Sequence, residues 1–231
     1  MATLDPATQS PDRRVRVSRR RLIVVGGGEH AAVVVDAARS EPDAWELLGF
    51  LDPSPPPGAA DRLGIDHLGD DPEMVERLRR AESDDEWLVI GFGAAAGARR
   101  EAVDRFGVAR WATIVHRTAW VSPSAVLGEG TVVFAGAIVN AGARTGRHAI
   151  VNTRSVIEHD VHLGDFAHVG PGSLVGGGAT LGDDVFVGLG GLIRDHVIVG
   201  AGSVVGMGSV VVDDVAPGST VVGSPARPLE P

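Results

Sequence analysis

The most regular feature of the chain is an aliphatic residue at every sixth position from Val121 to Val211. Fifteen of these sixteen positions hold Val, Leu or Ile, and the exception is Thr145. A second column, four residues after the first and running from Ala125 to Val215, holds only small or β-branched residues. A period of six predicts a solenoid of short parallel strands, with three hexads in each triangular coil.

The first half of the chain has a different rhythm, in which short apolar runs alternate with helical patterns. A β-branched run at Leu22–Val25 meets three glycines and then a helical pattern, and a second apolar run ends at Asp52. A helix is expected from Pro72, a third strand in "EWLVIGFG", and a last helix closed by Gly107. This alternation predicts a small α/β domain with a parallel sheet.

These two patterns divide the chain into four segments. We expect a flexible tail at 1–20, a Rossmann-like α/β domain at 21–112, a solenoid at 113–216 and a C-terminal tail at 217–231. The low aromatic content of 4% and the 32 glycines fit closely spaced, regular backbone in the solenoid.

Charge and cysteine content exclude several classes of function. The net charge of −9 argues against a nucleic-acid partner, and the absence of Cys excludes disulfides, thiolate nucleophiles and Cys-ligated zinc. No apolar run approaches the roughly 20 residues of a membrane span, and the first residues lack an apolar signal core. We therefore expect a cytoplasmic protein with no membrane partner.

Three histidines lie close together in the stretch "VIEHDVHLGDFAHVGPGS". With Ile157 as an inward residue, His159, His162 and His168 all fall outside the inward columns. We expect all three to face solvent or a neighbouring subunit, with His162 as a bystander. They stand in two different columns, which disfavours a zinc site, because zinc needs three converging imidazoles.

The repeat resembles the hexapeptide-repeat family, whose fold is the left-handed parallel β-helix. The string "IVNTRSVIEHDVHLGDFAHVGPGSLVGGGATLG", the join "VHRTAWVSPSAVLGEGTVV", the C-terminal "VVGSPARPL" and the order of domains resemble the bacterial sugar acyltransferases of the NeuD and PglD type. The resemblance implies a homotrimer that transfers an acyl group from acetyl-CoA or another acyl-CoA to an amino sugar. It also implies that the sugar is nucleotide-linked and that the sites lie between subunits.

The same resemblance assigns roles in the solenoid. It implies that His159 is the general base, with Asp160 as its orienting acid, although Glu158 competes with Asp160 for that role. Imidazole is well matched to taking a proton near neutral pH, and a neighbouring carboxylate stabilises the imidazolium that forms. His168 is implied near the thioester end of the donor and Asn152 in the acceptor pocket.

Three further positions are assigned to the donor. Gly177, in "VGGGAT", is the implied source of a backbone N–H for the developing oxyanion. Arg194 and Arg227 are expected to meet the phosphates of CoA, which runs in the groove between adjacent β-helices in this family.

The α/β domain is expected to hold the nucleotide of the acceptor. Backbone N–H groups at a glycine turn before a helix bind phosphate oxygens, and Gly26, Gly27 and Gly28 form such a turn. By the resemblance, His30 faces the acceptor and Asp52 contacts the nucleoside. The chain departs from the family pattern in having Glu29 before the histidine and Pro53 after Asp52, which leaves the identity of the nucleotide open.

Three alternatives to a sugar N-acyltransferase remain open at this point. A sugar O-acetyltransferase would use the same base. A zinc enzyme similar to the gamma-type carbonic anhydrases would need a metal, which we do not expect here. A solenoid that only binds or scaffolds would not depend on His159.

Overall fold

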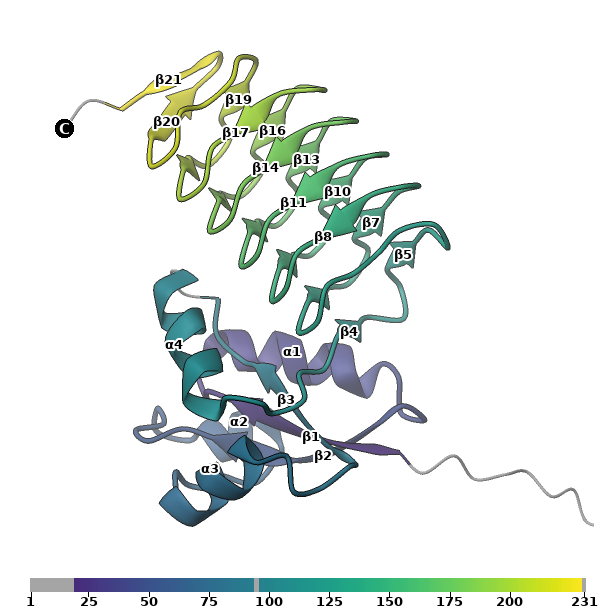
Figure 1. Cartoon of the computed structure of the whole chain (residues 1–231), viewed down its shortest axis with the longest axis vertical. Coiled ribbons are helices and arrows are strands. Elements are labelled where there is room, and N and C mark those ends of the chain that lie inside the picture. The colour runs from purple at the N-terminus through teal and green to yellow at the C-terminus, as the bar shows by residue number, and fades with distance from the viewer. Residues whose placement is uncertain (1–18, 94–95, 230–231) are drawn as a thin grey trace, which may run out of the picture.

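The computed structural model describes residues 19–93 and 96–229, which form an α/β domain followed by a three-sided parallel β-solenoid (Figure 1). The coils of the solenoid stack away from the α/β domain toward the C-terminus. The α/β domain and the hexad solenoid that the two sequence periods predict are both confirmed.

The α/β domain has three parallel strands in the order β2–β1–β3. The strands are β1 (Arg20–Val25), β2 (Trp45–Leu51) and β3 (Glu86–Ile90), and the helices are α1 (Glu29–Arg39), α2 (Ala59–Leu63), α3 (Pro72–Arg79) and α4 (Ala96–Phe106). The central strand β1 is apolar because both of its faces are covered. Only the five-residue helix α2, which follows a proline-rich loop, was not predicted.

The solenoid has three faces, which we number by the first strand of each. Face 1 contains β4 (Ile114–Val115), β6 (Val132–Val133), β9 (Ile150–Val151), β12 (His168–Val169), β15 (Phe186–Val187), β18 (Val204–Val205), β20 (Thr220–Gly223) and β21 (Ala226–Pro228). Face 2 contains β5 (Trp120–Val121), β7 (Ile138–Val139), β10 (Val156–Ile157), β13 (Leu174–Val175), β16 (Leu192–Ile193) and β19 (Val210–Val211). Face 3 contains β8 (Arg144–Thr145), β11 (His162–Leu163), β14 (Thr180–Leu181) and β17 (Ile198–Val199).

Each two-residue strand places its second residue inside the prism, where the aliphatic column forms one continuous core. The exception, Thr145, is accommodated because its hydroxyl oxygen accepts a hydrogen bond from the backbone N–H of Gly128 at 3.0 Å and lies 3.1 Å from the hydroxyl of Thr131. A buried hydroxyl with partners costs far less free energy than one without.

The α/β domain packs against the first coils of face 1. Helix α1 and strand β1 share a buried cluster with Ile114, Val132, Phe134 and Ile150 of the solenoid. The two domains are therefore joined through a common apolar core. The corner between faces 2 and 3, which is opposite face 1, points away from the α/β domain.

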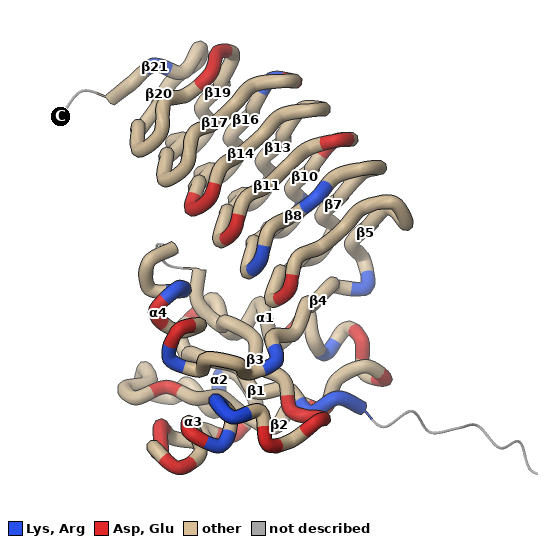
Figure 2. The backbone as a smooth tube through the Cα atoms, viewed as in Figure 1, with Lys and Arg blue, Asp and Glu red and all other residues tan. Residues whose placement is uncertain are grey.

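Face 2 presents an outward column that is wholly apolar. Its members are Trp120, Ile138, Val156, Leu174, Leu192 and Val210. Trp120 is 58% exposed and Leu192 is 42% exposed. Charged residues gather instead on the α/β domain and at the solenoid corners (Figure 2). A continuous apolar strip of this kind is typical of a surface that another protein chain covers.

The predicted tails differ from the structure in one respect. The segment 217–231 is not a simple tail, because β20 pairs with β18 and turns back antiparallel into β21. These strands extend face 1 by one further coil, since Val221 continues the inward column. At the other end, 18 of the residues predicted as a tail lie outside the described chain, and β1 begins at Arg20.

Candidate active site

The corner between faces 2 and 3 carries His159 and Asp160 in the turn between β10 and β11. His159 Nδ1 lies 3.0 Å from Asp160 Oδ2, so the ring donates its Nδ1 proton to the carboxylate. Asp160 has a φ of 58°, a left-handed conformation that Asp tolerates better than most residues. This turn orients the carboxylate toward the adjacent ring and leaves His159 Nε2 as the proton acceptor.

The carboxylates of Glu158 and Asp160, the two candidates for orienting the His159 ring, have different partners in the structure. Glu158 Oε2 accepts a hydrogen bond from Asn140 Nδ2 at 3.1 Å and from the backbone N–H of His159 at 3.3 Å. Only the Asp160 carboxylate reaches the imidazole. Geometry therefore favours Asp160 over Glu158 as the orienting acid.

The pKa of His159 is raised above its ordinary value of 6.5, chiefly by the hydrogen bond to Asp160 and further by the charges of Asp160 and Glu158. Both side chains are exposed, with 62% accessibility for His159 and 71% for Asp160. The dyad is thus open to a substrate or to a second chain.

Gly177 lies one coil beyond His159 at the same corner. A methyl group added at Gly177 would lie 2.7 Å from both Cε1 and Nε2 of His159, so a side chain there would force the exposed ring to move. Within the described chain, the Gly177 N–H donates to no acceptor, whereas its carbonyl accepts from His196 N. The proposed proton acceptor and a free backbone donor therefore lie side by side.

His168 departs from the expectation that it faces solvent or a neighbouring subunit. It points out of the prism from face 1, but the α/β domain of the same chain covers it, and it is only 7% exposed. Its ring centroid lies 6.4 Å from that of His30 and 5.1 Å from that of Phe186. The prediction was wrong because the period of six cannot indicate which outward positions another domain covers.

Asn152 joins this second cluster as a neighbour of His168. Asn152 Nδ2 donates to His168 Nε2 at 3.1 Å, and Asn152 Oδ1 accepts from Thr153 N at 2.8 Å, which fixes the orientation of the amide. His168 Nε2 is therefore an acceptor, and the neutral ring carries its proton on Nδ1. The structure thus brings His168, which was predicted near the donor, together with Asn152 and His30, which were predicted at the acceptor.

Burial keeps both of these histidines neutral. Desolvation, with a smaller contribution from the Arg99 charge, lowers the pKa of His30 to about 4 and that of His168 to about 3. Neither ring is suited to take a proton near neutral pH. This contrasts with His159, whose pKa is shifted in the opposite direction.

Arg99 makes a buried contact with the solenoid that the sequence pattern did not reveal. Its side chain is 2% exposed, and its guanidinium donates to the backbone carbonyls of His148, at 2.9 Å, and Phe166. These carbonyls belong to two successive coils at the corner between faces 3 and 1. Arg99 therefore fixes the start of α4 against the solenoid, beside the cluster of His30 and His168.

Replacing Arg99 with Met is expected to lower the free energy of unfolding by about 2–4 kcal/mol, because two buried carbonyls lose their donors. Urea unfolding measures the change. Arg100→Gln is the matched control, since the contacts of Arg100 are a partly exposed ion pair with Asp184 at 3.0 Å, worth about 1 kcal/mol or less, and a stacking contact with the Phe166 ring 4.3 Å away. Equal small losses in both variants would contradict the role of Arg99.

The glycine turn is built differently from a simple phosphate loop. The Gly27 N–H donates to Asp52 Oδ2 at 2.7 Å, and Asp52 Oδ1 accepts from Ser54 N at 2.9 Å. Asp52 therefore organises the turn, and Gly27 N–H is not free for a phosphate. Gly28, at the N-terminus of α1, has open space around it and no side-chain cap.

Arg62 supplies a positive charge at this turn that the sequence pattern did not indicate. Its Nη2 donates to the Gly27 carbonyl at 2.6 Å across 35 residues of sequence. The guanidinium lies next to the start of α1, where Glu29 otherwise adds a negative charge. The turn can thus receive an anion through Gly28, the helix N-terminus and Arg62.

Arg194 and Arg227 lie on the C-terminal coils, away from the glycine turn. Arg194 follows β16 two coils beyond Glu158 in the same corner and is exposed. Arg227 is exposed and forms a loose ion pair with Asp213, 3.7 Å away. Arg194 forms no ion pair among the described residues, and the exposed ion pair of Arg227 is weak, so both side chains can move toward an anion.

The structure does not bring the two clusters together within one chain. His159, Asp160 and Gly177 occupy the corner opposite face 1, whereas His30, Asn152 and His168 lie at face 1. The three histidines of the repeat therefore form no common site. Among the described residues, no group of three or more His, Asp or Glu side chains is arranged to hold a metal ion.

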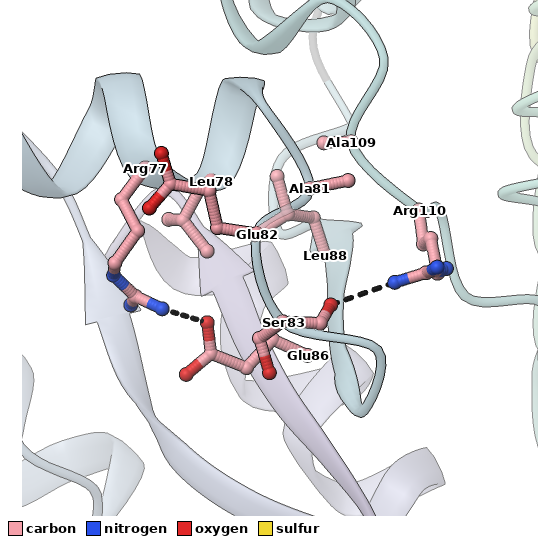
Figure 3. A pocket seen from close by; sticks show the side chains of 9 residues that line it. All are labelled: Arg77, Leu78, Ala81, Glu82, Ser83, Glu86, Leu88, Ala109 and Arg110. Atoms are coloured by element: carbon pink, nitrogen blue, oxygen red, sulfur yellow. Dashed lines mark hydrogen bonds and ion pairs between the residues drawn. The ribbon is translucent and has the colours of Figure 1, made fainter.

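Two of the hollows in or beside the α/β domain differ greatly in size. A cleft of about 620 Å³ opens next to His168, between the start of α4 and strands β15 and β18, with Gly93, Arg99 and Phe186 in its lining. A second hollow, near Arg77 and Arg110, encloses only about 10 Å³, room for about one water (Figure 3). Of these two, the cleft beside His168 has room for a sugar and the hollow near Arg77 does not.

Comparison with known proteins agrees with this architecture. Residues 21–106 match the PglD N-terminal domain. Among solved structures, PerB from Caulobacter crescentus, in complex with CoA and GDP-perosamine, is 32% identical, with a TM-score of 0.75 over 93% of this chain and 98% of that one. The acetyltransferase domain of PglB from Neisseria gonorrhoeae FA1090, in complex with acetyl coenzyme A, is 32% identical, with a TM-score of 0.81 over 92% and 100%.

A more distant structure, WeeI from Acinetobacter baumannii AYE, shares the fold at 22% identity, with a TM-score of 0.74 over 90% of this chain and 100% of that one. None of the curated proteins compared matches the chain in sequence. The family match and the two structures of 32% identity show that the protein is an acyltransferase. The chain belongs to the hexapeptide-repeat sugar acyltransferases of the NeuD and PglD type.

No helix in the part of the chain that the structure describes is long and apolar enough to cross a membrane.

Proposed function

We propose that the protein transfers the acetyl group of acetyl-CoA to the amine of a nucleotide-linked sugar, at sites between the subunits of a homotrimer. The observation that carries this proposal is the His159–Asp160 dyad, whose free Nε2 lies against Gly177. The complexes of PerB with CoA and GDP-perosamine and of PglB with acetyl coenzyme A support the choice of both substrates.

The chemistry is a direct transfer without a covalent enzyme intermediate. The neutral sugar amine attacks the thioester carbonyl carbon, and His159 Nε2 takes the proton that the nitrogen loses. The Gly177 N–H donates to the oxyanion of the tetrahedral intermediate, and Asp160 stabilises the imidazolium. The intermediate collapses to the amide, and the departing CoA thiolate receives the proton from His159 and leaves as the thiol.

The apolar column of face 2 supports the trimer. Six outward apolar side chains in line would be desolvated if three copies packed face 2 around an axis parallel to the solenoid. Rotation about such an axis does not shift the subunits along it, so equivalent coils of the three subunits lie at the same level. His159 and His168 are half a coil apart, so the dyad of one subunit would lie level with Asn152 and His168 of its neighbour.

This arrangement would complete the site from two chains. One subunit supplies the base and the oxyanion donor, and the next supplies the acceptor residues with the cleft beside His168. Arg194 and Arg227, on the coils beyond Gly177, would lie along the path of the CoA phosphates. The charge of either arginine would favour the phosphates.

A thiol-release assay tests the reaction. With acetyl-CoA and a panel of nucleotide-linked amino sugars, we expect CoA thiol to form together with a product heavier by one acetyl group in mass spectrometry. Matched sugars with a hydroxyl in place of the amine should release thiol far more slowly. If the hydroxyl sugars were acetylated equally fast or faster, the activity would be that of an O-acetyltransferase and the N-acetyltransferase proposal would be wrong.

The pH dependence of kcat/KM tests the dyad. The base acts in its neutral form, so activity should fall as pH falls through the raised pKa of His159. Asp160→Asn removes the main cause of that shift, so the acidic limb of the profile should move to lower pH, toward 6.5. Glu158→Gln is the control and should move the limb less. An unmoved limb in Asp160→Asn would show that another group titrates.

A further inference from the structure

A second cleft in the α/β domain lies at the C-terminal ends of β1 and β2, against one side of α4, and has a volume of about 300 Å³. Most of its lining is apolar. The lining residues are Val25, Gly26, Leu51, Asp52, Pro53, Phe92, Ala98, Glu101, Ala102, Arg105 and Phe106. The cleft meets the glycine turn at Gly26, where any side chain would collide with the ring of Phe92. Apolar walls of this kind suit a planar aromatic ring.

The charges of the cleft are mainly negative. Arg105 is engaged by Asp70, with Nη2 2.5 Å from Oδ1. Asp52 has both carboxylate oxygens occupied by backbone donors from Gly27 and Ser54. Glu101 lies at the mouth of the cleft, one helical turn before Arg105, and within the described chain it forms no hydrogen bond or ion pair. A free carboxylate on an apolar cleft selects for a group with N–H donors and against phosphate.

The nucleobases differ in what they offer such a carboxylate. Uracil and thymine have one ring N–H between two carbonyl oxygens, which a carboxylate repels. Adenine and cytosine have an amino group next to a ring nitrogen that accepts. Guanine alone has two adjacent parallel donors, the ring N–H and the amino group, which a carboxylate accepts in a bidentate pair.

We infer that this cleft binds guanine and that Glu101 accepts hydrogen bonds from its ring N–H and amino group, so that the carrier of the amino sugar is guanosine diphosphate. The inference rests on the proposed function. The diphosphate would then run from Gly26 over Gly28 and Arg62, where the positive charge lies, and would carry the sugar toward His30. At one end of this path, the Glu101 carboxylate would accept from the N–H donors of the base. At the other end, the positive charge of Arg62 would attract the phosphates.

Calorimetric binding of nucleoside diphosphates to the full chain tests this inference. We expect GDP to bind at least about 10-fold more tightly than UDP, dTDP or inosine diphosphate, which lacks the amino group, because a hydrogen bond to a charged group is worth about 1.5–3 kcal/mol. Glu101→Gln should bring the ratio of GDP to inosine diphosphate affinity close to one. Asp104→Asn, on the same helix but outside this cleft, should leave the ratio unchanged.

The outcomes separate this inference from the proposed function. UDP or dTDP binding as tightly as GDP, or a GDP preference that survives Glu101→Gln, overturns the guanine assignment. Efficient acetylation of a uridine-linked amino sugar but not of its guanosine-linked counterpart also overturns it and leaves the acetyltransferase intact. A third outcome is possible, in which GDP binds tightly and Glu101→Gln abolishes its preference, but no nucleotide-linked amino sugar is acetylated. That result would support the guanine site and contradict the proposed acetyl transfer.

Discussion

Replacing His159 with alanine is expected to lower kcat by about 10²–10⁴-fold, the contribution of a positioned general base. The side chain is exposed and makes no contact inside the prism, so its removal should not disturb the aliphatic core. The variant should therefore keep its melting temperature and its assembly state. Steady-state thiol release at saturating acetyl-CoA and sugar measures the loss.

His162→Ala is the matched control for this variant. His162 lies three residues further on, is also exposed, and contacts only the backbone carbonyl of Asp160 through its ring Nδ1. We expect it to retain nearly full activity. A His159→Ala enzyme with more than about a tenth of wild-type kcat would mean that another group removes the proton, and would favour a binding or scaffolding role for this corner.

Much of the solenoid could be predicted from the sequence because the hexad period fixes the direction of every side chain. An inward residue must be aliphatic or must satisfy its own polar atoms, and Thr145 does so through Gly128. The same period places His159 and His162 outside the prism, as the structure confirms. In repeat proteins each coil contacts only its neighbours, so a local pattern is sufficient to define the architecture.

The surroundings of His168 could not be predicted in this way. A residue that points out of the prism is exposed or buried according to what packs on that face, and this depends on contacts between residues far apart in the chain. Arg99, for example, reaches carbonyls 49 and 67 positions further on. Likewise, the bond from Gly27 to Asp52 depends on the distance between two strand ends, which no spacing in the sequence reveals.

The separation of the two clusters leads to the second prediction. If each site takes its base from one chain and its acceptor residues from the next, two inactive variants should restore activity when they are mixed. Co-expression of His159→Ala and His168→Ala chains with different affinity tags would give mixed trimers. In every trimer that contains both chains, one of the three sites would combine an intact His159 with an intact His168.

Thiol release by the doubly purified mixed trimers should therefore reach about a third of the wild-type rate, whereas each variant alone should be nearly inactive. A site built within one chain would recover nothing, since every chain in the mixture lacks one of the two histidines. His168 is buried, so Asn152→Asp, at the residue that donates to it, serves as a second acceptor-side variant if His168→Ala assembles poorly. A monomeric wild-type protein would contradict the interfacial site. Mixed trimers that are no more active than the parent variants would also contradict it. In either case, His159 and the acceptor residues would have to meet within one chain.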